Sequence, residues 1–130
     1  MSDNAPDRIL VQRYFAAMQG GAQATEEMVS LFSDDGEYIE PFSGQGQPTS
    51  HRGIAAIRAF FDDSFAGPLG HDVKLRLDRL DVDGAELRSE WTCEIPMWPA
   101  PMRGSDRYLI RDGKIARLEV TLHGPATAAR

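Results

Sequence analysis

The sequence contains one cysteine, Cys93, among 130 residues. A single cysteine cannot form a disulfide within the chain or supply a metal site built from several thiolates, and it fits a reducing compartment. Basic side chains are also few, since 14 lysines and arginines stand against 20 aspartates and glutamates and give a formal net charge of −6. Nucleic acids bind mainly through cations on their phosphates, so we expect no nucleic-acid partner.

Long hydrophobic runs are missing as well. No window approaches the roughly eighteen consecutive apolar residues that identify a membrane-spanning helix. The first residues, Met1 to Asn4, have neither the basic start nor the apolar stretch of a signal peptide. We therefore expect a cytoplasmic protein without a membrane partner.

The composition is otherwise that of an ordinary globular protein. Apolar residues make up 42% and charged residues 26% of the chain, which argues against intrinsic disorder. The sequence shows no internal repeat, linker or low-complexity segment. We predict a single domain over residues 1–130, with a frayed tail from Gly124 to Arg130.

Apolar residues at helical spacing predict three helices in the first half of the chain. The first covers residues 7–19 and ends at Gly20 and Gly21. The second is short, with Thr25 as its N-cap and acidic residues in its first turn. The third covers residues 53–66.

The second half of the chain changes to a period of two, which predicts strands. Asp-Gly pairs at 83–84 and 112–113 are typical of hairpin turns. We expect a turn at Ser33 to Gly36 and a loop from Gly44 to Arg52. The predicted strands are Glu37 to Phe42, a strand beginning at His71, Ala85 to Ile95, Met102 to Arg111 and Lys114 to His123. This order predicts an α+β domain in which a curved sheet wraps over helices.

Three polar residues break the apolar pattern. Glu40 shares a strand face with Tyr38 and Phe42, and Asp106 shares one with Tyr108. Tyr14 lies on the inner face of the first helix, where its hydroxyl needs a partner. Buried carboxylates with separated pKa values can perform acid–base chemistry, but each acid could also cap a strand or pair with an arginine.

Other residue types give weaker signals. The three histidines, His51, His71 and His123, fall in predicted loops or at strand ends without the spacing of a metal site, so we expect no metal. No nucleophile signature or phosphate-binding loop is present. Some apolar side chains could line a ligand cavity or simply form the core: Phe15, Met18, Phe60, Phe61, Phe65 and Trp91.

Several short segments between residues 9 and 122 stand out together: Val11-Gln12-Arg13-Tyr14 with Ala16-Ala17-Met18, Leu31-Phe32-Ser33-Asp34-Asp35, Glu40-Pro41, Gly53-Ile54-Ala55-Ala56-Ile57-Arg58 and Gly113-Lys114-Ile115. In order and approximate spacing they resemble the bacterial Δ5-3-ketosteroid isomerases. That family lies within the nuclear transport factor two-like, or SnoaL-like, group. The resemblance implies a conical, cystatin-like roll, in which a curved mixed or antiparallel sheet wraps around three helices and encloses an apolar cavity.

The resemblance also implies a reaction and a set of residues. A β,γ double bond of a 3-keto steroid, or of a similar enone, moves into conjugation through a dienolate without a cofactor. Tyr14 would be one oxyanion donor, Glu40 the base and Asp106, kept neutral in an apolar site, the second donor. The substrate would lie against the following residues: Met18, Phe42, Phe61, Phe65, Trp91, Tyr108 and Leu122.

Two positions depart from the family pattern. Glu40 stands where aspartate is more usual, and Phe61 stands where some members carry a tyrosine that supports the oxyanion tyrosine. The resemblance further implies a homodimer through the exposed face of the sheet, which would carry Glu86, Arg88 and Glu90.

Two alternatives keep the same fold. One is a SnoaL-like polyketide cyclase or an epoxide hydrolase, the latter with a water held by two acids and an arginine. The other is a non-catalytic protein that binds a hydrophobic ligand.

Overall fold

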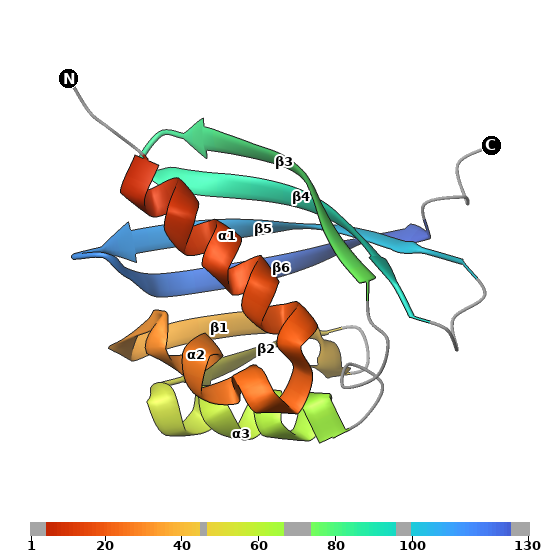
Figure 1. Cartoon of the computed structure of the whole chain (residues 1–130), viewed down its shortest axis with the longest axis horizontal. Helices are drawn as coiled ribbons and strands as arrows, with labels where there is room; N and C mark the ends of the chain where they lie inside the picture. The colour runs from red at the N-terminus through yellow and green to blue at the C-terminus, as the bar shows by residue number, and fades with distance from the viewer. Residues whose placement is uncertain (1–4, 45–46, 67–73, 96–99, 126–130) are drawn as a thin grey trace.

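The structure is a computed structural model that describes residues 5–44, 47–66, 74–95 and 100–125. It contains three α-helices, a 3-10 helix and one mixed sheet of six strands. All three α-helices lie on the same face of the sheet, and the long strands bend around them (Figure 1). The predicted α+β fold with a curved sheet and three helices is therefore confirmed. No helix in the described ranges is long and apolar enough to cross a membrane.

The helices begin and end close to the predicted positions. They are α1 (Ala5–Gly20), the 3-10 helix η1 (Gly21–Ala24), α2 (Thr25–Ser30) and α3 (Ile54–Ala66). Gly21 has a φ of 66°, a left-handed conformation that ends α1. Thr25 is the first residue of α2 and not its N-cap, because Ala24 occupies the cap position without a side-chain hydrogen bond. The acidic first turn, formed by Glu26 and Glu27, is as predicted.

Five of the six strands coincide with the predicted ones. The strands are β1 (Phe32–Gly44), β2 (Gln47–Arg52), β3 (Lys74–Asp83), β4 (Glu86–Glu94), β5 (Met102–Arg111) and β6 (Lys114–Pro125). Their order in the sheet is β2-β1-β6-β5-β4-β3. β1 and β6 are parallel, and all other neighbours are antiparallel.

The prediction of a loop from Gly44 to Arg52 was wrong, because Gln47–Arg52 forms the edge strand β2. An edge strand is held by backbone pairing to one neighbour, here β1, and most of its side chains face solvent, so it shows no alternation of apolar residues. The predicted turn at Ser33 to Gly36 also lies within a strand. It coincides with a shift in the β1–β6 register between Phe32 and Glu37.

Two other predictions fall partly outside the described residues. The strand predicted from His71 begins in the structure at Lys74, and residues 71–73 are not described. In the predicted tail, Gly124 and Pro125 belong to β6, and the remainder lies outside the described ranges.

The core fills the space between the helices and the inner face of the sheet. Strand alternation sends one set of side chains inward, as on β4, where Leu87, Ser89, Trp91 and Cys93 are all buried. On β5 the inward residues are Gly104, Asp106 and Tyr108. The helices and the sheet both contribute fully buried apolar side chains to the core: Val11, Met28, Ile57, Phe61, Tyr108, Ile115 and Leu118.

Candidate functional site

A cavity of about 450 Å³ opens between α1, α3 and the inner face of the sheet. This volume lies within the usual range for a small-molecule site. Most of its wall is apolar. The described residues that line it are Tyr14, Met18, Tyr38, Phe42, Phe60, Asp63, Ser64, Leu75, Trp91, Cys93, Ile95, Asp106 and Val120.

Asp106 is the acid at the inner end of this cavity, with a side chain that is almost entirely buried. Trp91 Nε1 donates a hydrogen bond to its Oδ1 at 3.0 Å. Its Oδ2 accepts hydrogen bonds from the hydroxyls of Tyr108 at 2.8 Å and Ser89 at 3.1 Å. Three donors on one carboxylate are an arrangement that suits its ionised form.

The pKa of Asp106 results from two opposed effects. Burial raises it and the hydrogen bonds from Trp91, Tyr108 and Ser89 lower it; burial has the larger effect, so the pKa is raised from 3.8 to about 6. A carboxyl group with a pKa about 6 is mostly ionised at neutral pH and can take up a proton at little cost. Asp106 can therefore act as a base inside an apolar cavity.

Two tyrosines share the cavity with Asp106. Tyr14, from α1, and Tyr38, from β1, are buried, and their side chains are hydrogen-bonded to each other. Burial, with the nearby Asp106 charge, raises the pKa of both phenols far above the ordinary value. Both hydroxyls therefore stay protonated at physiological pH, and because one of them donates to the other, one O–H of the pair is available as a hydrogen-bond donor.

Glu40 lies on the same face of β1 as Tyr38 and is completely buried. Its carboxylate is directed toward β2 and its own strand: Oε2 lies 2.8 Å from His51 Nε2, and Oε1 accepts a hydrogen bond from the Phe42 backbone N–H at 2.6 Å. Glu40 is not among the residues that line the cavity. The structure thus brings Tyr14 and Asp106 to one cavity and leaves Glu40 behind its wall.

The residues that the resemblance implies as substrate contacts divide into two sets. Met18, Phe42 and Trp91 line the cavity. Phe61, Phe65 and Tyr108 are buried in the core, and Leu122 packs against the core without lining the cavity. Helical and strand periodicity identifies the inward face of an element, but a face packed against other side chains and a face open to a void have the same pattern.

Some residues of the site had not been singled out from sequence. Tyr38 is hydrogen-bonded to Tyr14, Ser89 donates a hydrogen bond to Asp106, and His51 pairs with Glu40. Tyr38 and Ser89 carried a usable signal, because both are polar residues on strand faces that are otherwise apolar. His51 has no such signal, since it lies on the edge strand β2, for which the sequence predicts a loop.

The described residues contain no group of three or more histidine, cysteine, aspartate or glutamate side chains placed to hold a metal ion. His51 pairs with Glu40, and His123 Nε2 lies 2.8 Å from Ser105 Oγ. His71 lies outside the described residues.

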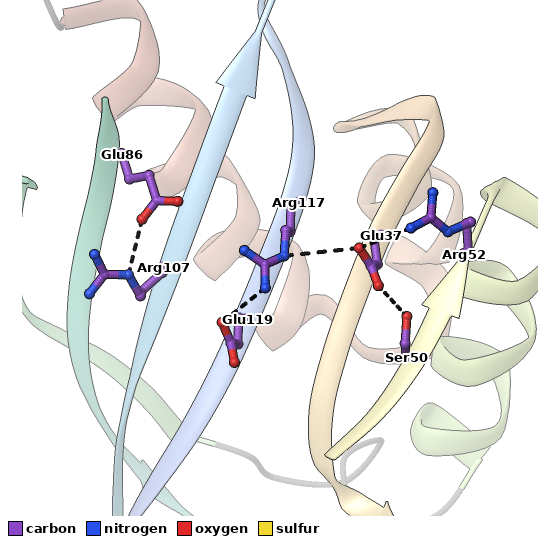
Figure 2. Close-up of polar contacts among 7 residues, drawn as sticks. All are labelled: Glu37, Ser50, Arg52, Glu86, Arg107, Arg117 and Glu119. Atoms are coloured by element: carbon purple, nitrogen blue, oxygen red, sulfur yellow. Dashed lines mark hydrogen bonds and ion pairs between the residues drawn. The ribbon is translucent and has the colours of Figure 1, made fainter. Parts of the chain in front are cut away.

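The opposite face of the sheet is charged, and its charges are paired within the chain (Figure 2). Arg107 on β5 donates to Glu86 on β4 at 3.0 Å, and Arg117 on β6 lies between Glu119 and Glu37. Glu37 also accepts a hydrogen bond from Ser50 at 2.5 Å. Apart from Arg117–Glu119, which lies within β6, these contacts join neighbouring strands, and the face carries charges of both signs.

Comparison with known proteins identifies the family. The family model of the SnoaL-like domain matches residues 11–118. No curated protein matches the chain. Solved structures share the fold at low identity, which says nothing about activity.

Three of these structures are informative. A protein of unknown function with a cystatin-like fold from Methylobium petroleophilum has a TM-score of 0.75 at 18% identity, and the match covers 98% of this chain and 82% of that one. A candidate ketosteroid isomerase from Kribbella flavida has a TM-score of 0.66 at 21% identity, with 90% and 77% covered. A candidate polyketide cyclase from Sinorhizobium meliloti has a TM-score of 0.68 at 21% identity, with 87% and 94% covered.

Proposed function

The chain belongs to the SnoaL-like domain family, and on that premise we propose that it is an enzyme that forms and stabilises the enolate of a flat, apolar ketone. The reaction is that of a steroid delta-isomerase, which moves a β,γ double bond of a 3-keto steroid or similar enone into conjugation. One observation carries the proposal: Asp106 and Tyr14 line the same largely apolar cavity.

The chemistry needs a base beside the α-carbon of the ketone and a hydrogen-bond donor beside its carbonyl oxygen. The Asp106 carboxylate removes a proton from the carbon between the carbonyl and the double bond, and the electrons move onto the carbonyl oxygen. Tyr14 donates a hydrogen bond to that oxygen as its negative charge develops. Asp106 then returns the proton to the γ-carbon, so that no external acid, base or cofactor is consumed.

Tyr38 assists this step from behind Tyr14. In this proposal Tyr38 donates its hydroxyl proton to the Tyr14 oxygen, which fixes the direction of the Tyr14 O–H and leaves that O–H for the substrate. A donor fixed in advance stabilises the enolate without a rearrangement during the reaction. Tyr38 is therefore a positioning residue in this proposal.

This proposal differs from the family resemblance in the identity of the base. The resemblance implied Glu40 as the base and Asp106 as a neutral donor. Here the carboxylate that meets the cavity is Asp106, and it accepts three hydrogen bonds as an ionised acid does. The Glu40 carboxylate contacts His51 and the Phe42 backbone instead.

The alternatives to isomerisation can be weighed in the same way. A polyketide cyclase also begins by forming an enolate, so the first half of the proposed reaction is common to both enzymes and only the second half distinguishes them. An epoxide hydrolase needs an arginine between its acids. Among the described residues, Asp106 is hydrogen-bonded to a tryptophan, a tyrosine and a serine, which does not favour that reaction.

The test measures the two halves of the reaction separately. Purified protein is mixed with a 5-ene-3-keto steroid, and the absorbance of the conjugated enone is followed. In parallel, exchange of the α-hydrogens with deuterium oxide is followed by mass spectrometry. Exchange without conjugation would support an enolate-forming enzyme of another kind, such as a cyclase. If the steroid binds but neither signal appears, the protein is a binding protein and the proposal fails.

We also propose a homodimer formed through the charged face of the sheet. Its pairing of charges within each chain supports this, because a face that carries both signs does not repel a second copy. Light scattering of the purified chain tests the assembly, and Arg107→Glu, which places like charges beside Glu86 and Asp83, should weaken it. A monomer at micromolar concentration would contradict it.

A further inference from the structure

The cavity has one buried end and one open end, and each end carries at least one polar side chain. At the buried end lie Tyr14, Tyr38 and Asp106, none of them more than 3% exposed. At the open end, Phe42 lines the cavity although it is 47% exposed, and Asp63 lines it although it too is exposed. Lining residues that are also exposed mark the place where the cavity meets solvent.

Helix α3 is responsible for the acid at the open end. Phe60, Asp63 and Ser64 are separated by three and four positions, so they form one stripe along the helix, and all three line the cavity. Asp62, the neighbouring acid, is exposed and does not line the cavity. The position of Asp63 on the cavity stripe is therefore a property of its helical register.

The charges of the lining have one sign. Two carboxylates, Asp63 and Asp106, line the cavity, and the lining found among the described residues includes no lysine, arginine or histidine. A low-dielectric cleft concentrates the field of such charges. An anionic ligand would meet this field without a counter-charge from the described part of the lining.

We infer that the substrate is a ketone with a second polar group at the opposite end, a hydroxyl or an ammonium that donates to Asp63, and that ligands with a carboxylate or sulfate there are rejected. The inference rests on the proposed function for placing the ketone at Asp106. The distance between the two polar ends then sets a minimum length for the ligand, and the apolar wall between them excludes polar groups along its middle.

The effect of Asp63 should be moderate because the side chain is exposed. Ion pairs at exposed positions change an equilibrium constant by about two- to fivefold. Screening should reduce the effect further as salt is added. A larger effect that did not depend on salt would indicate a buried contact and not the open end described above.

The experiment uses three 4-ene-3-keto steroids that differ only in the group at the far end: hydroxyl, ammonium or carboxylate. Their dissociation constants are measured by isothermal titration calorimetry with the full chain, with Asp63→Asn and with Asp62→Asn as the matched control. We expect the wild-type chain to bind the ammonium and hydroxyl compounds more tightly than the carboxylate. Asp63→Asn should reduce the ratio of ammonium to carboxylate affinity by about fivefold, and Asp62→Asn should change it by less than about twofold.

The outcomes separate the inference from the proposed reaction. If the stated order appears and Asp63→Asn removes it, the inference holds even where a separate assay finds no isomerisation. If the chain isomerises 5-ene-3-keto steroids but binds the carboxylate compound as tightly as the others, the inference alone fails. If none of the three compounds binds, the inference and the proposed substrate class are both overturned.

Discussion

The indole N–H of Trp91 donates to Asp106 Oδ1 at 3.0 Å, and the ring of Trp91 lies against the backbone of Gly104. Trp91 and Gly104 are directly opposite in the β4–β5 ladder, and Ser89 is opposite Asp106. The tryptophan therefore crosses the neighbouring strand at a residue without a side chain and reaches the carboxylate two positions further along. Gly104 is as much a part of the site as the tryptophan itself.

Gly104→Ala should disturb this arrangement. A Cβ at position 104 would lie 2.6 Å from Cη2 of Trp91, much closer than side-chain carbon atoms approach in proteins, so the ring must move and its bond to Asp106 must lengthen. We expect a loss of about 1–3 kcal/mol in the free energy of unfolding, measured by urea denaturation. Trp91→Phe removes the donor but keeps the space above Gly104, and it serves as the comparison. Wild-type stability and activity in Gly104→Ala would contradict the contact.

Asp106→Asn and Asp106→Leu distinguish a base from a donor. An asparagine can still donate a hydrogen bond but cannot take up a proton, and leucine can do neither. If Asp106 is the base, both variants should lose about 10²–10⁴-fold in kcat/KM for enone formation. Circular dichroism and steroid binding confirm that each variant is folded.

The contrary result is equally clear. An asparagine variant that keeps most of the activity that leucine loses would show that Asp106 acts as a donor. The base would then have to be another group, and Glu40 would be the first candidate.

The pH dependence of kcat/KM also distinguishes whether Asp106 acts as a base or as a neutral donor, and it needs no mutation. Burial raises the pKa of Asp106 to about 6. A base must be ionised, so activity should rise as the pH increases through about 6 and then stay level. A neutral donor would require the opposite, a fall in activity above about 6. Initial rates at constant ionic strength between pH 4.5 and about 8 decide between the two directions.

The stability of the protein should also depend on Asp106. Its pKa in the folded protein is about 6, above the ordinary 3.8, so the folded protein holds this proton more tightly than the unfolded chain. The stabilisation is fully present below about pH 4 and is lost as the pH rises through about 6, by on the order of 3 kcal/mol. The difference in unfolding free energy between wild type and Asp106→Asn isolates this group, and it should shift in favour of the variant as the pH rises. A shift in the other direction would mean that the three hydrogen bonds outweigh burial.

Hydrophobic periodicity in the sequence was sufficient to predict most of the fold. The helices and the strands β3 to β6 bury one face against the core, so apolar residues recur in their sequences at helical or strand spacing. The edge strand β2 escaped prediction because it is held by backbone hydrogen bonds to β1, and these bonds are independent of side-chain type. Its burial is too slight to leave an apolar alternation.

The site was predictable only in part, for a different reason. Glu40, Asp106 and Tyr14 could be singled out because polar residues on buried faces need partners. Which partners they find depends on neighbouring strands: Asp106 meets Trp91 and Ser89 through the β4–β5 register, and Glu40 meets His51 through β2. Sequence spacing within one element cannot show contacts that arise between elements.

Glu40→Gln is the prediction that bears most directly on the two candidate bases. Glutamine keeps an oxygen that can accept from the Phe42 N–H, and its amide can still pair with His51, so the structure should persist. Because Glu40 does not line the cavity, kcat/KM should stay within about tenfold of wild type, well short of the 10²-fold or greater loss that removal of a general base causes. Glu40→Ala, by contrast, leaves its two part-buried partners without this acceptor and should cost about 1–3 kcal/mol of unfolding free energy. A folded Glu40→Gln variant whose activity falls as far as that of Asp106→Asn would show that the Glu40 side chain turns into the cavity when substrate binds, and it would return the role of base to Glu40.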